Sequence, residues 1–156
     1  MQLHTLLSSD TIQLGLNADT KESAISELID LLEGHPAVTD LDLVRNSVLE
    51  REEEMSTGVG KGLGLPHAKT NGVTTNVAAL AIITDGLDFD AVDEEAVRII
   101  FLLVGPPDSK SIHVRILSRI SRLMNIAESR TALLAAKSNT DVLHLIKRLE
   151  IEMIAG

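Results

Sequence analysis

Two long apolar runs are the strongest feature in the pattern of hydrophobic and polar positions. Residues 77–83 and 97–104 each have the length and composition expected of a strand that is buried on both faces. Residues 11–16 alternate apolar and polar side chains, which predicts a third, half-buried strand. Between the two long runs, Asp85-Gly86 and the acidic residues through Glu95 predict a turn and an exposed connection.

Apolar residues spaced by three and four predict helices before and after these strands. Asp19-Thr20-Lys21-Glu22 has the form of a capping box that starts the first helix, and Gly34 and Pro36 stop it. Further helices are expected at 40–54, 109–125, 129–137 and 140–153. Because helices precede and interleave with the strands, we expect a three-layer α/β fold with a mixed sheet between helices.

The helix expected at 109–125 has two distinct faces. Its buried stripe is expected to consist of four residues: Ile112, Ile116, Ile120 and Leu123. On another face, Arg115, Arg119 and Arg122 follow each other at helical spacing, and we expect them to face solvent.

Composition and charge narrow the class of protein. A length of 156 residues predicts one domain over 1–156, and two Phe without Trp or Tyr predict an aliphatic core. The chain has no Cys, which excludes disulfides and thiolate chemistry and fits a reducing compartment. Without a targeting segment or an apolar run near membrane-spanning length, we expect a cytoplasmic protein with no direct membrane insertion. A net charge of −9 argues against binding nucleic acid.

A Gly-rich stretch leads directly to a histidine. Glycine occupies every second position from Gly58 to Gly64, so an extended conformation would bare the backbone on one face. Pro66 fixes its own φ and favours an extended Leu65, which holds His67 in a defined place. The stretch fits no phosphate-loop pattern, and nucleotide binding is therefore disfavoured. A tight turn with a structural histidine is the alternative interpretation.

Residues 56–67, Ser-Thr-Gly-Val-Gly-Lys-Gly-Leu-Gly-Leu-Pro-His, resemble a known active-site signature. It is that of the EIIA type-2 domains (fructose/mannitol class, including nitrogen-regulatory EIIA) of the bacterial phosphoenolpyruvate-dependent phosphotransferase system. In that family the signature histidine carries a phosphoryl group, an arginine precedes it by sixteen residues and a second histidine follows it by forty-six. The same spacings lead here to Arg51 and His113. Gly64 departs from the family, which usually has alanine there.

The resemblance implies a fold and a mechanism. It implies a roughly five-stranded mixed sheet flanked by helices, and a relay in which His67 becomes a tele-phosphohistidine, modified at Nε2. The donor would be an HPr-like phosphocarrier and the acceptor an EIIB-like domain, for sugar uptake. Arg51, in the last turn of its helix, would supply compensating charge, and His113, in the first turn of its helix, a hydrogen-bond donor. Ser56 or Thr57 would bind the phosphate, and no metal or cofactor is implied.

Three other functions stay open at this point. A nitrogen-regulatory EIIA would use the phosphohistidine to control binding to a regulatory protein instead of feeding a sugar permease. A metal-dependent hydrolase would have to use the five histidines, but no pair has the i, i+4 spacing of helical ligands. An unphosphorylated interaction domain could keep the same fold. The identity of the sugar is not encoded in this chain, because selectivity in the resembled system lies in other components.

Overall fold

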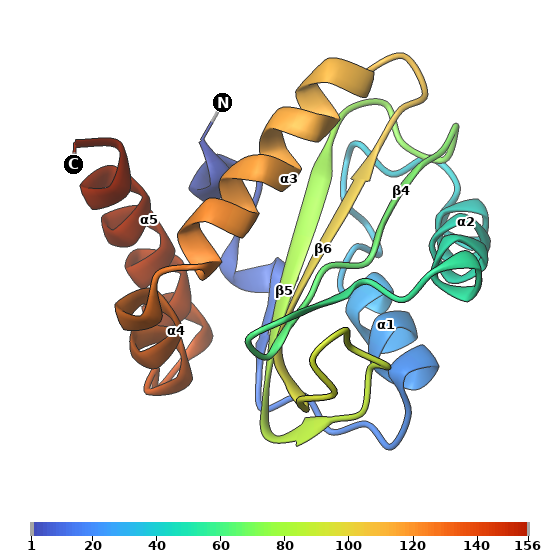
Figure 1. Ribbon diagram of the computed structural model, residues 1–156. Coiled ribbons are helices and arrows are strands. Elements are labelled where there is room, and N and C mark those ends of the chain that lie inside the picture. Colours follow the sequence, from blue (N-terminus) through green and yellow to red (C-terminus); the bar gives the residue numbers. More distant parts are fainter. Residues whose placement is uncertain (1, 156) are drawn as a thin grey trace.

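The computed structural model describes residues 2–155 and has a sheet covered by helices on both faces (Figure 1). The strands are β1 (Ile12–Leu14), β2 (Gly58–Gly60), β3 (Leu63–Gly64), β4 (His67–Lys69), β5 (Val77–Leu87) and β6 (Val97–Gly105). The α-helices are α1 (Lys21–Asp30), α2 (Leu41–Glu54), α3 (Lys110–Met124), α4 (Ala127–Leu134) and α5 (Asn139–Ala155). Two short 3-10 helices, η1 (Leu3–Thr5) and η2 (Ser9–Thr11), come before β1.

The two long apolar runs form the centre of the sheet. β5 and β6 pair antiparallel, with Leu80 opposite Phe101, and β1 lies parallel to the outer edge of β5. β3 and β4 both run parallel to β6, one after the other along its free edge, and β2 continues the sheet beyond β3. The expected α/β fold with three layers and a mixed sheet of about five strands is thereby confirmed.

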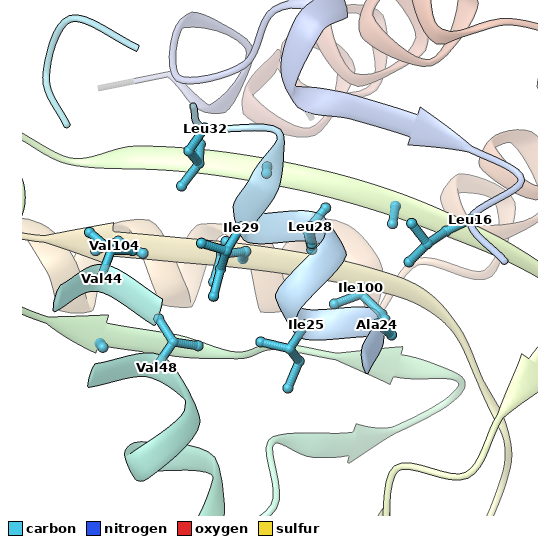
Figure 2. Close-up of a cluster of buried hydrophobic side chains, with 14 of the residues drawn as sticks. Leu16, Ala24, Ile25, Leu28, Ile29, Leu32, Val44, Val48, Ile100 and Val104 are labelled. Atoms are coloured by element: carbon cyan, nitrogen blue, oxygen red, sulfur yellow. The ribbon is translucent and has the colours of Figure 1, made fainter. Parts of the chain in front are cut away.

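Alternate residues of β5 and β6 face two separate hydrophobic cores. On one side, Ala79, Ile100 and Val104 pack against α1 and α2, where Ile25 and Ile29 are fully buried (Figure 2). On the other side, neighbouring positions such as Leu80 and Phe101 pack against η1, α3, α4 and α5. Burial on both faces explains why these strands are continuous apolar runs instead of alternating ones.

The helix starts follow local side-chain chemistry, with one correction. Asp40 caps α2 by accepting a hydrogen bond from the Leu43 N–H at 3.1 Å. At α1 the cap is Thr20, which accepts from the Ser23 N–H at 3.1 Å, and not the predicted Asp19. Both residues offer an oxygen, so the sequence pattern fits a start at either one.

The Gly-rich stretch is a hairpin and not the extended strand that the sequence analysis allowed. β2 and β3 are antiparallel. Gly60, at the end of β2, and the turn residues Lys61 and Gly62 have φ values of 100°, 59° and 77°. Positive φ is readily available to glycine, which accounts for two of the alternating glycines. Lys61 is held there by a 2.9 Å hydrogen bond from its N–H to Asp93.

A buried carboxylate joins the beginning of the chain to α5. Glu150, fully buried, accepts hydrogen bonds from the Leu3 N–H at 2.6 Å and the His4 N–H at 3.2 Å, and lies 3.3 Å from the Arg119 guanidinium. Arg119 is therefore partly buried and paired, which corrects its predicted solvent position.

The buried stripe of α3 also differs from its prediction. It contains His113, Ile116, Ile120, Leu123 and Met124, whereas Ile112 is 41% exposed. Among residues 2–155, no helix combines the length and apolar character needed to cross a membrane.

Candidate functional site

The side chain of His67 lies on the α3 side of an edge strand. In β4, His67 pairs with Leu103 of β6, and the next residue, Ala68, packs into the core on the α1 and α2 side. Since successive side chains of a strand point to opposite faces, His67 and Lys69 lie on the face that α3 covers. No further strand pairs with the outer edge of β4 within residues 2–155, and His67 is only half-buried.

One hydrogen bond fixes the tautomer of His67. Its Nδ1 lies 2.7 Å from the carbonyl oxygen of Leu65, which can only accept, so Nδ1 carries the proton. Leu65 is held in turn by its N–H, which donates to the Thr57 carbonyl at 2.9 Å. In the neutral ring, Nε2 then carries a free lone pair.

Several groups act on the charge state of His67. Burial lowers its pKa below the ordinary value of 6.5, the Leu65 carbonyl opposes this, Arg51 lowers the pKa further, and Glu52 raises it. The net direction is downward, and the imidazole is therefore mainly neutral at pH 7. A neutral ring with a bare Nε2 can act as a nucleophile or as a hydrogen-bond acceptor.

The second histidine lies beside the first. The ring centroids of His67 and His113 are 5.9 Å apart, with their planes tilted by 50°. His113 projects from the first turn of α3, is 4% exposed, and has a pKa lowered to about 4 by burial and by the charges of His67 and Lys69. Within the described residues its Nε2 is buried without a hydrogen-bond partner. The buried ring of His113 thus lies directly beside the half-buried ring of His67.

Arg51 comes from α2, in the helix layer opposite α3. It lies in the last turn of α2, which packs beside β4 (Figure 1), and its charge acts on His67. Although four glutamates surround it in sequence, none of the carboxylates of residues 2–155 lies within ion-pair distance of its guanidinium. Binding of an anion near His67 by this guanidinium stays a prediction.

The two hydroxyls that precede the hairpin have partners inside the protein. Thr57 donates its hydroxyl to Glu52 at 2.5 Å, and its N–H also donates to Glu52, at 2.8 Å. Ser56 donates its hydroxyl to the Phe89 carbonyl and accepts from the Gly58 N–H at 3.1 Å. Both hydroxyls hold the start of the hairpin, and phosphate binding by Ser56 or Thr57 stays a prediction.

Three residues around the site were not predicted from the sequence. Glu52 is buried, although its place in a run of glutamates suggested that it faces solvent. Its spacing of four and eight residues from Val48 and Val44 puts it on the buried face of α2, and this spacing could have indicated its burial. Lys69 is two residues beyond His67 and therefore on the same side of β4. For Asn76, which lies next to His113, no pattern in the sequence gave a signal. In the described part of the chain, no group of three or more His, Asp or Glu side chains is placed to hold a metal ion.

The comparisons with known proteins agree with this geometry. Residues 5–149 match the model of a family described as "Phosphoenolpyruvate-dependent sugar phosphotransferase system, EIIA 2". The PTS system fructose-specific EIIA component of Haloferax volcanii is 38% identical over 140 residues, which cover 90% of this chain and 91% of that protein. The fructose-specific EIIABC component of Bacillus subtilis is 30% identical over 148 residues, which cover 95% of this chain but 23% of that longer protein.

A solved structure supports the same relationship. The nitrogen regulatory protein IIA-Ntr from Neisseria meningitidis superimposes with a TM-score of 0.85 at 26% identity, covering 92% of this chain and 98% of that one. The family match spans the edge strand, the hairpin before it and the helices that carry Arg51 and His113. This chain therefore belongs to the EIIA 2 family of the phosphoenolpyruvate-dependent sugar phosphotransferase system.

Proposed function

We propose that the chain is a phosphoryl relay in which Nε2 of His67 accepts a phosphoryl group from the phosphohistidine of an HPr-like carrier. The observation that carries the proposal is the 2.7 Å hydrogen bond from Nδ1 of His67 to the Leu65 carbonyl. It leaves the lone pair on Nε2, and the lowered pKa keeps that lone pair unprotonated at pH 7. His67 is half-buried and lies at the edge of the sheet, where a carrier protein would approach.

In the transfer step, the phosphoryl group moves from one imidazole to another. The Nε2 lone pair forms a bond to phosphorus while the N–P bond of the carrier breaks, and the electron pair of that bond returns to the carrier's ring. His67 keeps its Nδ1 proton, shared with Leu65. Because little covalent chemistry remains, the site has mainly to align the two rings and to stabilise charge on the phosphoryl oxygens. Arg51, which has no carboxylate partner among residues 2–155, can do so with a planar fork of donors.

From His67 the phosphoryl group would pass to an EIIB-like partner for sugar uptake in the cytoplasm. The chain has no Cys, so if the acceptor is a cysteine thiolate, it belongs to the partner. Similarity to a fructose-specific EIIA component, at 38% identity, and to a fructose-specific EIIABC component, at 30% identity, supports a sugar-transport role. Similarity to the nitrogen regulatory protein IIA-Ntr supports a second candidate, in which the phosphorylation state of His67 controls binding to a regulatory protein.

A phosphate-labelling assay tests the relay. The purified chain is incubated with labelled phosphoenolpyruvate, enzyme I and HPr, and the label on the chain is followed over time. We expect His67→Ala to take up no label and Arg51→Ala to be labelled roughly 100-fold more slowly, the usual effect of losing one group that stabilises transition-state charge. His144→Ala, a histidine exposed on α5, is the matched control and should behave like the wild type.

A second stage separates the two candidate roles. Adding an EIIB domain of the fructose class should remove the label from His67 if the chain feeds a sugar permease. Retention of the label, with partner binding that depends on phosphorylation, would favour the regulatory role. A His67→Ala protein that is labelled like the wild type would refute the relay altogether.

A further inference from the structure

The two ring nitrogens of His113 have different surroundings. Nδ1 lies 3.4 Å from Oδ1 of Asn76, and Nε2 is buried without a partner in residues 2–155. The lowered pKa of His113 keeps the ring neutral, so only one nitrogen carries a proton. With Oδ1 of Asn76 facing it, that proton is on Nδ1. Nε2 then has only a lone pair and cannot donate a hydrogen bond to a phosphoryl oxygen.

Asn76 is buried and tightly packed beside His113 and Gly105. It is 6% exposed and directly precedes β5. A Cβ atom added to Gly105 would lie 2.2 Å from Oδ1 of Asn76 and 3.0 Å from Nδ1 of His113, so only glycine leaves room for both side chains. An amide is the one neutral side-chain group that offers an acceptor and a donor at nearly equivalent positions. A half-turn of the Asn76 amide would present its NH2 group to Nδ1 of His113.

We propose that Asn76 is a positioning residue that sets the tautomer of His113. When His67 is free, the Asn76 carbonyl faces Nδ1 and the proton is on Nδ1. When His67 carries a phosphoryl group, the amide turns, its NH2 donates to Nδ1, and the proton is on Nε2, where it is donated to a phosphoryl oxygen. One proton leaves Nδ1 and one binds Nε2 by exchange with water, and the net charge of the ring is unchanged. This inference rests on the proposed phosphorylation of His67.

The tautomers can be read directly by NMR. In protein labelled with 15N-histidine, the ring-nitrogen shifts of His113 distinguish Nδ1–H, Nε2–H and the charged ring, and they are recorded at pH 8 before and after phosphorylation. We expect Nδ1–H in the free wild type and Nε2–H in the phosphorylated one. Asn76→Asp offers acceptors only and should hold Nδ1–H in both states, since exchanging amide and carboxylate beside a histidine changes its tautomer.

The variant also has a kinetic signature. Asn76→Asp should still accept phosphate on His67 but about 10-fold to 100-fold more slowly, the usual effect of losing one hydrogen bond to a charged group. Asn71→Asp makes the same substitution at an exposed position of the same connection and should keep the wild-type tautomers and rate. An unchanged His113 proton position on phosphorylation of the wild type, or a wild-type tautomer change in Asn76→Asp, would overturn the proposal.

The failure of the relay itself is distinguishable. If mass spectrometry finds no phosphoryl group on wild-type His67, the proposed function is wrong. The role of Asn76 is then decided by the free protein, in which Asn76→Ala should remove the preference for Nδ1–H. A free Asn76→Ala protein that keeps Nδ1–H as strongly as the wild type would show that Asn76 does not set the tautomer.

Discussion

Replacing Glu52 by alanine should destabilise the fold more than any change at the neighbouring exposed glutamates. The Glu52 side chain is 3% exposed and accepts two hydrogen bonds from Thr57, while Lys21 lies 3.5 Å away. In the variant, the N–H and hydroxyl of Thr57 lose their acceptor in a buried place, at about 1–3 kcal/mol each.

The expected loss is therefore about 4 kcal/mol. Since Lys21 retains Asp90 at 3.5 Å, the lysine adds little to it. For a chain of this size, 1 kcal/mol shifts the melting temperature by about 2–4 °C, so Glu52→Ala should melt roughly 10 °C below the wild type. Thermal unfolding followed by circular dichroism measures this difference. Glu53→Ala is the matched control, because Glu53 is exposed, and its melting temperature should stay close to that of the wild type.

A second measurement connects Glu52 with the site. Its charge raises the pKa of His67, so removing the carboxylate should lower that pKa further, which an NMR titration of the ring can follow. If Glu52→Ala melts within about 2 °C of the wild type, the carboxylate is not the anchor of the hairpin that we describe, and Thr57 must be held in another way.

Three further predictions concern stability. The folded-state pKa of His113, about 4, lies below its unfolded value, so the contribution of His113 to the free energy of unfolding is present above pH 6.5 and is lost as the pH falls to 4. Urea titrations should show that, over this pH range, the free energy of unfolding of the wild type falls by roughly 2–3 kcal/mol more than that of His113→Gln. A difference in free energy of unfolding between the two proteins that does not change with pH would contradict this prediction. Glu150→Ala leaves the Leu3 N–H without its acceptor and should lower the free energy of unfolding by about 3–5 kcal/mol, whereas Glu152→Ala, whose side chain is 64% exposed, should change it by less than about 1 kcal/mol. Gly58→Ala places a Cβ 2.8 Å from Cα of Ala91 and should cost about 1–3 kcal/mol by thermal unfolding; a melting temperature equal to that of the wild type would show that the connection after β5 gives way freely.

Most of the fold could be predicted because its signals are local. The runs at 77–83 and 97–104 are long enough to be recognised as buried strands, and Asp40 marks the start of α2 by its own hydrogen-bonding chemistry. The Gly-rich stretch was harder, because glycine is compatible with both an extended strand and a turn. Only the pairing of β2 with β3 decides between them.

The site could be predicted only as far as residue type and spacing go. His67 and His113 are indeed neighbours, but the burial of His113 depends on which face of α3 meets the sheet. Arg51, which is partly exposed, and Glu52, which is buried, are consecutive residues of α2, and their different environments follow from how the helix packs. Asn76 reaches His113 only because β5 and α3 are brought together by β6.

The hydrogen bonds that Glu150 accepts hold the two ends of the described chain close together, which makes circular permutation of the protein practicable. Leu3 is tied to Glu150, and α5 ends only five residues later, at Ala155, which at 1.5 Å per residue is a distance of about 7.5 Å along the helix. A few added residues would thus connect one end of the described chain to the other on the side away from β4. The polypeptide could then be reopened within residues 92–96, which are exposed in the connection after β5, giving a circularly permuted protein in which the edge strand and both histidines keep their neighbours.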